Sequence, residues 1–542
     1  MTLTEIDQYI GDNRVYYEKN THITESFVNI TFDELQDLTD DEFDQWVKDV
    51  RSEVLRIWDT HDIPPRSGGR NINEIKVQLN RITSTPVSKI EGIDDLDNDG
   101  RPNAILNRTG LGVVADQFFP TMYKTRINQT KHDDGYSIYD LFNGDRFEKS
   151  MLHRSRRHHR RDGMYHFAFT LLKDDNTYSP IKSDSAIEWI KAHKDNPKIF
   201  RGVDFFVENC DPPGYVNDGY YQVNTGDTLT MDFDEVKDLF NQGYLVLRNV
   251  RNININEHVD GKVYRVRIYK KGQRVFPRGL IPFRIGYTQP AVNFPPFTAK
   301  YLYERFTEHL IDQDRIVIYD PSAGWGGRIL GAMSVKDDRK IHYVGTDPNP
   351  DNHFSEHNTS RYECLAGFFN SCTIRSNPVF SHSNTCDIYD SCSEEIYKEK
   401  RFQQYKGQVD LVFTSPPYFN REAYSEDERQ SYKRYGSSYE SWKRGYLRPT
   451  LETCYDWMKS GAYILWNIAN LQMGKDFLPL EKDSCNIMED LGFEKIITLK
   501  MALEGMPGSN RVDENGIPIH THTCKIGNRH WKYEPIFVYR KP

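Results

Sequence analysis

The strongest constraint on the fold is an apolar run that leads directly into a glycine-rich turn. Residues 316–319 (IVIY) are expected to form a buried strand, and the turn 320–327 (DPSAGWGG) follows it. The apolar residues of 329–333 then continue as a helix. A strand, a glycine-rich turn and a helix in this order form a ligand-binding corner at the carboxyl edge of a parallel sheet. The turn is not a phosphate-binding P-loop, because neither Lys-Ser nor Lys-Thr follows its glycines.

From about residue 290 onward, apolar strands alternate with helical stretches. Further strands are expected at 341–346, 409–413, 461–468 and 533–539. This alternation is typical of a doubly wound α/β sheet. The sequence therefore predicts a Rossmann-like α/β domain with a mixed sheet over residues 286–542, preceded by a separate α+β N-terminal region.

The first half of the chain is expected to divide near residue 75. In the segment 1–75, apolar side chains recur at helical spacing between Phe43 and Trp58, which predicts a helical segment. A helix that packs on the rest of the chain explains this spacing better than a DNA-binding helical subdomain does. Residues 76–285 mix strand-like runs with short helices, which indicates an α+β region.

Composition and charge patterns exclude several classes of protein. No apolar run reaches the roughly 20 residues that span a bilayer, and the N-terminus lacks the basic end and apolar stretch of a signal peptide. The 8 cysteines are scattered singly, as expected of free thiols in a reducing cytoplasm. The segment 94–99 resembles a calcium loop in composition alone. We therefore expect a cytoplasmic protein with no membrane partner and no metal site; its oligomeric state is left open.

The net charge of −9 is weak evidence against a nucleic-acid partner, because a basic groove can lie beside acidic flanks. One dense basic run, 153–161 (HRSRRHHRR), contrasts with the acidic balance. Its arginines are Arg154, Arg156, Arg157, Arg160 and Arg161. Arginine pairs well with phosphate, so the run is a candidate for phosphate contact; a solvated charged face is the alternative.

Two further aspartates occupy positions that suit a nucleoside ligand. Asp347 follows the expected strand 341–346, where a carboxylate can accept hydrogen bonds from ribose hydroxyls. Capping of a helix N-terminus is the alternative role for Asp347, and both roles are compatible. Asp387 follows the strand-like pair 379–380 and is expected to meet an adenine amino group.

The expected strand 409–413 runs directly into Thr414, Ser415, Pro416, Pro417 and Tyr418. Two prolines fix the backbone and remove two donors, so the carbonyl groups remain as fixed acceptors. An aromatic ring follows at once. This combination suits a planar amine: the serine side chain and a proline carbonyl accept its two hydrogens, and the ring of Tyr418 stacks on the base.

In these motifs the sequence resembles the amino-methyltransferases of DNA, which make N4-methylcytosine and N6-methyladenine. The tetrapeptide of that family is matched by Ser415-Pro416-Pro417-Tyr418, and its cofactor loop by the turn 320–327. The stretch 293–300 resembles its preceding cofactor helix. The resemblance covers roughly residues 285–542, with the cofactor loop before the tetrapeptide.

The resemblance implies S-adenosyl-L-methionine as cofactor and methyl transfer to an exocyclic amine of DNA. Cofactor-binding residues are then expected at Phe297, Thr298, Asp320, Ser322, Ala323, Gly324, Gly326, Gly327, Asp347 and Asp387. Ser415, Pro416, Pro417 and Tyr418 are the expected catalytic residues. No nucleophilic Pro-Cys pair is present, which disfavours carbon-5 methylation. Serine in the first position favours cytosine N4 slightly over adenine N6.

A stacked base cannot reach such a pocket, so double-stranded DNA with a flipped target base is the expected partner. The segment 419–436 is expected to be a mobile loop over that base, with Arg421, Lys433 and Arg434 contacting DNA; an ordinary surface loop is the alternative. Few residues follow the expected substrate loop 505–510, which leaves the region 76–285 as the candidate for target recognition.

Other functions remain open at this point. A methyltransferase of RNA or of a protein amine could carry a similar tetrapeptide, and so could a non-catalytic DNA-binding protein with a relic domain. The resemblance also suggests a restriction-modification setting in a bacterial or phage-infected cell. No nuclease motif is evident in the first half of the chain, so restriction activity in the same chain is not expected.

Overall fold

The computed structural model describes residues 28–30, 32–61, 72–106, 113–127, 137–143, 169–172, 178–181, 245–247, 266–268, 291–335, 340–376, 384–436, 438–473, 476–503, 522–526 and 529–542. The chain divides into two compact units. One unit comprises residues 1–19, 70–140 and 288–542, and the other comprises residues 20–69 and 141–287. Among the described residues, no helix is both long and apolar enough to cross a bilayer.

The second unit contains one long helix, α3 (Asp40–His61), next to the short α2 (Phe32–Asp37). Thr39 begins α3 with a capping box: its hydroxyl accepts from the Glu42 amide at 3.3 Å, and Glu42 Oε2 accepts from the Thr39 amide at 2.8 Å. The apolar face of α3 is buried and includes Trp46, whose indole donates to the Val28 carbonyl at 2.8 Å. The apolar spacing thus predicted this helix correctly.

The other described elements of this unit are two small antiparallel hairpins. They pair β4 (Phe169–Leu172) with β5 (Tyr178–Ile181), and β6 (Leu245–Leu247) with β7 (Val266–Ile268). The short α6 (Ile138–Asn143) adds Phe142, whose ring lies 6.4 Å from that of Trp58.

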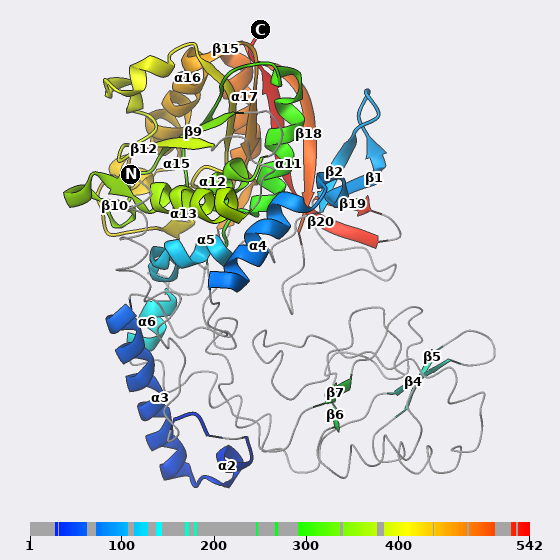
Figure 1. Cartoon of the computed structure of the whole chain (residues 1–542), viewed down its shortest axis with the longest axis vertical. Helices are drawn as coiled ribbons and strands as arrows, with labels where there is room; N and C mark the ends of the chain where they lie inside the picture. The colour runs from blue at the N-terminus through cyan, green and yellow to red at the C-terminus, as the bar shows by residue number, and fades with distance from the viewer. Residues whose placement is uncertain are drawn as a thin grey trace. The chain divides into compact units, whose positions relative to one another are not determined.

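The first unit is built on a ten-stranded sheet with the order β1-β2-β18-β20-β15-β13-β8-β9-β12, with β19 paired to β20 (Figure 1). Its strands are β1 (Glu91–Leu96), β2 (Pro102–Leu106), β8 (Ile316–Asp320), β9 (Ile341–Thr346), β12 (Thr385–Tyr389), β13 (Val409–Thr414), β15 (Met458–Asn467), β18 (Glu494–Ala502), β19 (Thr523–Ile526) and β20 (Arg529–Arg540). The strands from β12 to β15 run parallel to one another, whereas β20 lies antiparallel between β15 and β18.

The chain adds β9 and β12 on one side of β8 and then β13 on its other side. The carboxyl ends of β8 and β13 therefore form a topological switch point. In open α/β sheets, ligands bind outside the carboxyl ends of the strands at such a point. The Rossmann-like, doubly wound mixed sheet predicted from the sequence is confirmed.

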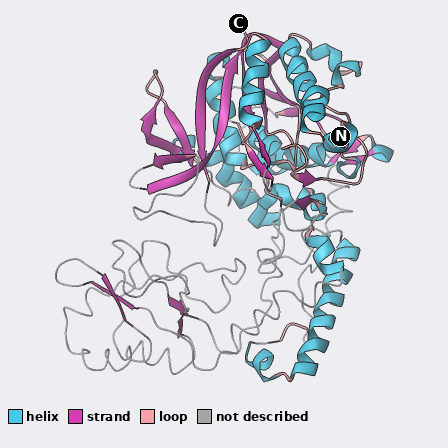
Figure 2. Cartoon of the chain, turned by 180° about the vertical axis from the view of Figure 1, so that it is seen from behind, coloured by secondary structure: helices cyan, strands magenta, loops and turns pink. Residues whose placement is uncertain are grey.

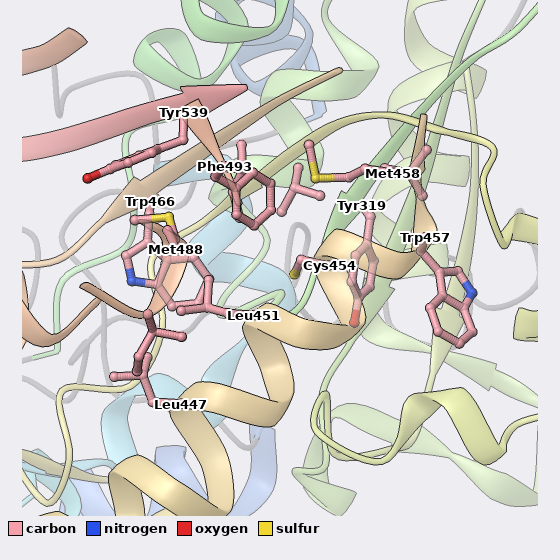
Figure 3. Close-up of a cluster of buried hydrophobic side chains, with 14 of the residues drawn as sticks. Tyr319, Leu447, Leu451, Cys454, Trp457, Met458, Trp466, Met488, Phe493 and Tyr539 are labelled. Carbon is pink, nitrogen blue, oxygen red and sulfur yellow. The ribbon is translucent and has the colours of Figure 1, made fainter. Parts of the chain in front are cut away.

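Both faces of the sheet are covered, because alternate residues of each central strand face opposite sides. Val317 and Tyr319 of β8 join a core cluster with residues of α16 (Arg448–Trp457), as Figure 3 shows for Tyr319 and Cys454. On the other face, Phe413 of β13 meets Tyr303 of α11 (Pro296–Phe306) edge to face at 5.7 Å.

The remaining helices and strands of this unit flank the sheet (Figure 2). They are α4 (Ile72–Ser84), α5 (Val113–Phe118), β3 (Arg126–Ile127), α11 (Pro296–Phe306), α12 (Gly327–Met333), β10 (His353–Phe354), β11 (Thr359–Ser360), α13 (Arg361–Ser376), β14 (Glu422–Ala423), α14 (Ser431–Arg434), α15 (Tyr439–Trp442), β16 (Leu471–Met473), β17 (Asp476–Leu478) and α17 (Leu480–Asp490). Short 3-10 turns, among them η4 (Pro120–Lys124), connect them.

Residues 70–140 group structurally with this sheet. The hairpin β1–β2 extends it, since Ala104 of β2 pairs in parallel register with Lys500 of β18. Lys300 of α11 is buried and donates to the carbonyls of Ile82 and Thr83 at 3.1 and 3.0 Å, where it satisfies the C-terminal end of α4. The sequence-based division instead placed residues 76–140 with the region up to 285. Their Asp- and Asn-rich composition concealed this hairpin.

Candidate functional site

The glycine-rich turn after β8 is shaped by close packing within the chain. Gly326 has a φ of +79°, and a Cβ there would lie 2.4 Å from the ring of Phe119. A Cβ on Gly327 would lie 2.0 Å from the Phe294 carbonyl oxygen. Gly324 has a φ of +65°, is partly exposed, and has no atom closer than 3.4 Å to an added Cβ. Gly326 and Gly327 therefore serve packing, while Gly324 leaves room beside the turn.

Asn293 holds this turn from the side. Its amide donates to the Trp325 carbonyl at 2.7 Å, and its side-chain oxygen accepts from the Gly327 amide at 3.1 Å. The bend at Pro295 and Pro296 then starts α11. The stretch 293–300 was expected to precede the cofactor loop as a helix, and its first residues instead clamp that loop. A single asparagine before two prolines gave no signal for this contact.

Asp320, at the end of β8, is completely buried and connects the turn to the next strand. It forms an ion pair with Arg328 at 2.6 Å and accepts hydrogen bonds from Tyr343 at 2.6 Å and Thr414 at 2.7 Å. The amide of Ser322 also donates to it at 3.1 Å. Its oxygens are thus engaged inside the chain. This placement favours a positioning role over the direct cofactor contact expected from the sequence.

Asp347 lies directly after β9 and is partly exposed. Oδ1 accepts from the Asn349 amide at 3.0 Å, and Oδ2 accepts from Asn352 at 2.7 Å and Tyr362 at 2.6 Å. Burial raises the pKa of this carboxyl, against the hydrogen bonds that lower it. A carboxylate has about four acceptor positions, so Oδ1 keeps capacity for one more donor. The N-cap of the following turn η8 (Pro350–Asn352) is Asn349 and not Asp347, since the Asn349 side chain accepts from the Asp351 amide at 3.1 Å.

Asp387 lies within β12, where it pairs in register with Val344, two positions before the strand ends. Its carboxylate accepts from the Tyr405 hydroxyl and lies 3.8 Å from His342 Nε2. The exposed Asp390, which follows β12, forms an ion pair with Arg429 at 2.7 Å. Asp390 therefore occupies the strand-end position that was predicted for Asp387. The prediction placed the strand at residues 379–380, which lie outside the described residues, whereas β12 begins at Thr385.

Phe297 and Thr298, expected to bind the cofactor, are both fully buried in α11. Lys300 lies over the Phe297 ring at 5.8 Å. The Thr298 hydroxyl has no hydrogen-bond partner among the described residues. Ala323 is also buried, and its amide donates to the Thr346 carbonyl at 2.9 Å. These residues shape the turn from inside the fold.

Ser322 is partly exposed, and its hydroxyl lies 3.2 Å from the Tyr446 hydroxyl. Tyr446 belongs to a π-helical turn, η12 (Lys443–Leu447), between α15 and α16. Such single turns occur often at functional sites because they redirect a side chain. Burial raises the pKa of Tyr446. The sequence did not identify Tyr446, because no residue pattern marks a π-turn within a helix.

The tetrapeptide lies at the carboxyl end of β13, beside the turn that follows β8. Ser415, Pro417 and Tyr418 are partly exposed, and Pro416 is buried. The next residue, Phe419, has a φ of +53°, a costly conformation for an aromatic residue. Its buried ring packs edge to face on Trp442 at 5.7 Å, which holds the turn in place. Strain of this kind clusters at functional sites.

Two partly buried carboxyl groups lie next to the tetrapeptide. The Tyr418 hydroxyl donates to Glu534 of β20, and the Tyr424 hydroxyl donates to Glu422 at 2.6 Å. Burial raises the pKa of both carboxyls and of both phenols. Tyr424 also lies 5.4 Å, ring to ring, from Trp325 of the glycine-rich turn. The sequence gave Glu534 no role beyond membership of the last strand.

The basic residues expected to contact DNA fall into three groups. Arg154, Arg156, Arg157, Arg160 and Arg161 lie outside the described residues, as does the expected substrate loop 505–510. Lys433 donates to the Glu426 carbonyl at 2.8 Å, and Arg434 forms an ion pair with Glu395 at 2.6 Å. Arg421 has no side-chain ion pair within the described part of the chain, so its charge is less engaged inside the protein than the charges of Lys433 and Arg434.

The segment 419–436 was expected to be a mobile loop, and in the structure part of it pairs with a short strand from the first half of the chain. Its strand β14 pairs with β3, and Arg126 of β3 lies 3.1 Å from Glu426.

Within the described residues, no group of three or more His, Cys, Asp or Glu could hold a metal ion. The described cysteines are free, and burial raises the pKa of Cys386 and of Cys454, which disfavours thiolate chemistry at these two residues.

Comparison with known proteins gave no matching family model and no matching curated protein. Solved structures with a similar arrangement include proteins described as methyltransferases or modification methylases. A protein of Thermus thermophilus, described as a candidate DNA modification methylase, is 20% identical with a TM-score of 0.19, over 28% of this chain and 50% of its own. The chain therefore spans about half the length of that structure.

Two further structures are described as S-adenosylmethionine-dependent methyltransferases. The one from Methanosarcina mazei is 11% identical, with a TM-score of 0.24, over 43% of this chain and 96% of its own. The TehB-like one from Corynebacterium glutamicum is 10% identical, with a TM-score of 0.23, over 46% of this chain and 90% of its own. All three TM-scores lie far below 0.5, and we base no inference on these likenesses.

Proposed function

We propose that this chain transfers a methyl group from S-adenosyl-L-methionine to an exocyclic amino group. The observation that carries the proposal is the placement of the two sequence motifs on one edge. The glycine-rich turn follows β8 and the tetrapeptide follows β13, and these strands are direct neighbours in parallel register. The switch point of the sheet therefore brings the two motifs together, which supports a cofactor site beside an amine-binding site.

The residues present fit such a cofactor. Gly324 leaves room beside the turn, and Oδ1 of Asp347 retains an acceptor position at the end of β9. Ser322, two residues before Gly324, supplies a partly exposed hydroxyl. When bound, S-adenosyl-L-methionine would supply an electrophilic methyl group on a sulfonium. Gly324, Ser322 and Asp347 are the residues that we expect to hold it.

The tetrapeptide supplies the amine-binding part of the proposal. An exocyclic amine is a weak nucleophile, because its lone pair is conjugated into the ring. When Ser415 and a proline carbonyl accept its two hydrogens, the nitrogen moves toward a tetrahedral form with a free lone pair. Tyr418 offers a stacking surface for the ring that bears the amine. The chain's contribution is then mainly orientation, with no covalent intermediate on the enzyme.

We further propose that the acceptor is a base of double-stranded DNA that is flipped out of the helix, with cytosine N4 slightly favoured over adenine N6. The polar tetrapeptide and the stacking ring support a nucleic-acid substrate, as does Arg421, which forms no ion pair with the described residues. The region up to 285, with its basic run 153–161, is the proposed site of target recognition. We propose the division of the chain into 1–75, 76–285 and 286–542 as a division of function alone. In the fold, residues 70–140 group with residues 288–542.

The test is methyl transfer from labelled S-adenosyl-L-methionine to duplex DNA, RNA and protein, followed by sequencing of modified bases in DNA from cells that express the chain. We expect label in DNA, and loss of at least about 100-fold in rate for Ser415→Ala at unchanged thermal stability. Asp490→Asn, at an exposed ion pair with Arg448, is the matched control. Label only in RNA or protein would redirect the proposal, and no cofactor-induced thermal shift would refute it.

A further inference from the structure

One short segment from the first half of the chain contacts both the glycine-rich turn and the loop that follows the tetrapeptide. The segment 119–127 contains the 3-10 turn η4, in which Pro120, Thr121, Met122 and Tyr123 are buried. It follows α5, which packs beside α13 (Figure 1). Closely packed interiors transmit small displacements, so a restraint at one end of so short a segment reaches the other end.

The N-terminal end of the segment 119–127 packs on the glycine-rich turn. The buried ring of Phe119 occupies the space that a Cβ on Gly326 would need. The same ring lies 4.8 Å from the ring of Tyr362. Tyr362 donates to Asp347 Oδ2 at 2.6 Å, and its hydroxyl also contacts the Gly324 carbonyl. Phe119 therefore supports the turn and a side chain that holds the carboxylate after β9.

Thr121 reaches the same carboxylate through one intermediate side chain. Its hydroxyl donates to Asn352 Oδ1 at 2.8 Å, and the Asn352 amide donates to Asp347 Oδ2 at 2.7 Å. An ionised carboxylate only accepts, so the amide NH2 of Asn352 faces Asp347 and its oxygen faces Thr121. Thr121 and Asn352 are both buried. The Thr121 hydroxyl therefore fixes the orientation in which Asn352 holds the carboxylate.

The C-terminal end of the segment 119–127 holds the loop after the tetrapeptide. β3 pairs antiparallel with β14, where Ile127 lies opposite Glu422. Arg126 forms ion pairs with Asp140 at 2.8 Å and with Glu426 at 3.1 Å. The strand β14 is thus joined by its backbone and by a side chain to the segment that supports the cofactor turn.

The cofactor turn and the loop also meet directly. The buried ring of Trp325 lies 5.4 Å from the ring of Tyr424, whose hydroxyl donates to Glu422 at 2.6 Å. The loop after the tetrapeptide is therefore in contact with the glycine-rich turn through Tyr424 and with the segment 119–127 through β14.

We propose that the segment 119–127 joins cofactor binding to the placement of this loop, with Thr121 as a positioning residue for Asp347. This inference rests on the proposed function and deepens it. A donor bound at Asp347 restrains that carboxylate, and with it Asn352 and Thr121, so that the segment holds β14 more firmly against β3. The state in which the loop is held is then the state in which Asp347 is set to accept, which gives the cofactor a differential affinity for it. Such coupling is reciprocal, so a firmly held loop also strengthens cofactor binding.

Hydrogen exchange measures the loop without any turnover, with S-adenosyl-L-homocysteine as the probe. In the wild-type chain, saturating probe should slow amide exchange in β14 by about 10-fold. At equal saturation, the slowing should fall below about 3-fold in Thr121→Val, which removes the hydroxyl at similar volume. Thr121→Ser keeps the donor and should restore the wild-type response.

Calorimetry measures the affinity for the same probe. Thr121→Val should weaken binding by about 10-fold, because the buried oxygen of Asn352 loses its donor. Thr83→Val is the matched control, since the Thr83 hydroxyl is also buried and its hydrogen bonds to the Leu79 and Asn80 carbonyls stay within α4. We expect Thr83→Val to keep both the affinity and the slowing of exchange in β14.

Arg126→Gln tests the other end of the segment at a partly exposed position, where the chain tolerates substitution. It should speed exchange in β14 without the probe and, by reciprocity, weaken probe binding by about 3-fold. This variant keeps the test open even where Thr121→Val unfolds the chain, and thermal unfolding of each variant shows that it is folded.

The outcomes separate this inference from the proposed function. A wild-type chain that binds neither S-adenosyl-L-methionine nor S-adenosyl-L-homocysteine refutes the function itself. A wild-type chain that binds the probe with unchanged exchange in β14 overturns the coupling. Wild-type affinity and exchange in Thr121→Val, or in Arg126→Gln, overturn it as well, and so do equal losses in Thr121→Val and Thr83→Val.

Discussion

The buried ion pair of Asp320 and Arg328 links the two motifs of the candidate site at the level of single residues. Asp320 accepts from Thr414, which directly precedes Ser415, while Arg328 also donates to the Ser322 carbonyl. The two strands are therefore held together by side chains as well as by their backbone ladder. We expect a substitution in this pair to change both the free energy of unfolding and the geometry of the tetrapeptide.

Asp320→Asn tests this link. The substitution leaves the Arg328 guanidinium buried without its counter-charge, which costs about 3–5 kcal/mol when a buried pair is broken. Urea unfolding should show a loss of this size, together with a reduced rate of methyl transfer. Arg448→Ala breaks an exposed ion pair and should change stability by about 1 kcal/mol or less. An Asp320→Asn chain as stable as wild type would show that the pair does not hold the site.

His342 gives the chain a predictable response to acid. Burial, together with the charge of Arg315, lowers the pKa of His342 to about 4, against the opposing effect of Asp387. The imidazole also lies 2.8 Å from the hydroxyls of Thr385 and Tyr405. The unfolded chain takes up the proton near pH 6.5, so the contribution of a neutral His342 to stability is complete above that pH and is lost as the pH falls toward 4.

His342→Gln removes the titration and keeps a polar side chain. Between pH 7 and pH 5, the free energy of unfolding of the wild type should fall by about 1–2 kcal/mol more than that of the variant. Urea unfolding at the two values measures this difference. Equal losses in both chains would mean that other groups carry the acid response.

At the scale of elements, the apolar pattern was enough to find the central strands. The runs 316–319, 341–346 and 409–413 were predicted within one residue of β8, β9 and β13, because strands buried on both faces are continuously apolar. The hairpin β1–β2 was missed, since the sequence of β1, EGIDDL, is acidic. β18 was also missed, since its first three residues are exposed and interrupt the apolar pattern.

The candidate site divides in the same way. Motif residues that follow a strand, such as Ser415 and Asp347, lie where the sequence placed them, because a strand end fixes the position of the next residue. Asp387 and Tyr446 could not be located from sequence. The position of Asp387 depends on where an irregular strand begins. The position of Tyr446 depends on a π-turn that no local pattern encodes. Glu534 is brought in by an antiparallel pairing between distant segments, which only the folded chain reveals.

At the scale of the whole molecule, an acidic chain that binds DNA must concentrate its positive charge. With a net charge of −9, long-range attraction is weak, and phosphate contacts must come from local clusters. Lys433 and Arg434 are committed to acidic partners within the chain. The run 153–161 is the densest group of arginines in the sequence, and we propose that it contacts the DNA backbone; it belongs to the half of the chain proposed to recognise the target.

Replacement of Arg154, Arg156, Arg157, Arg160 and Arg161 by Gln should weaken DNA binding at all sequences. Each lost phosphate contact should reduce the slope of log K against log salt by about 0.9, which fluorescence anisotropy over a salt series measures. The matched control is Lys433→Gln with Arg434→Gln, for which we expect a change in slope below that of a single contact. Methyl transfer at saturating DNA should be retained in the five-arginine variant, because none of these residues belongs to the glycine-rich turn 320–327 or to the tetrapeptide in the sequence. An unchanged slope would move the backbone contacts to another surface, with Arg421 as the first candidate.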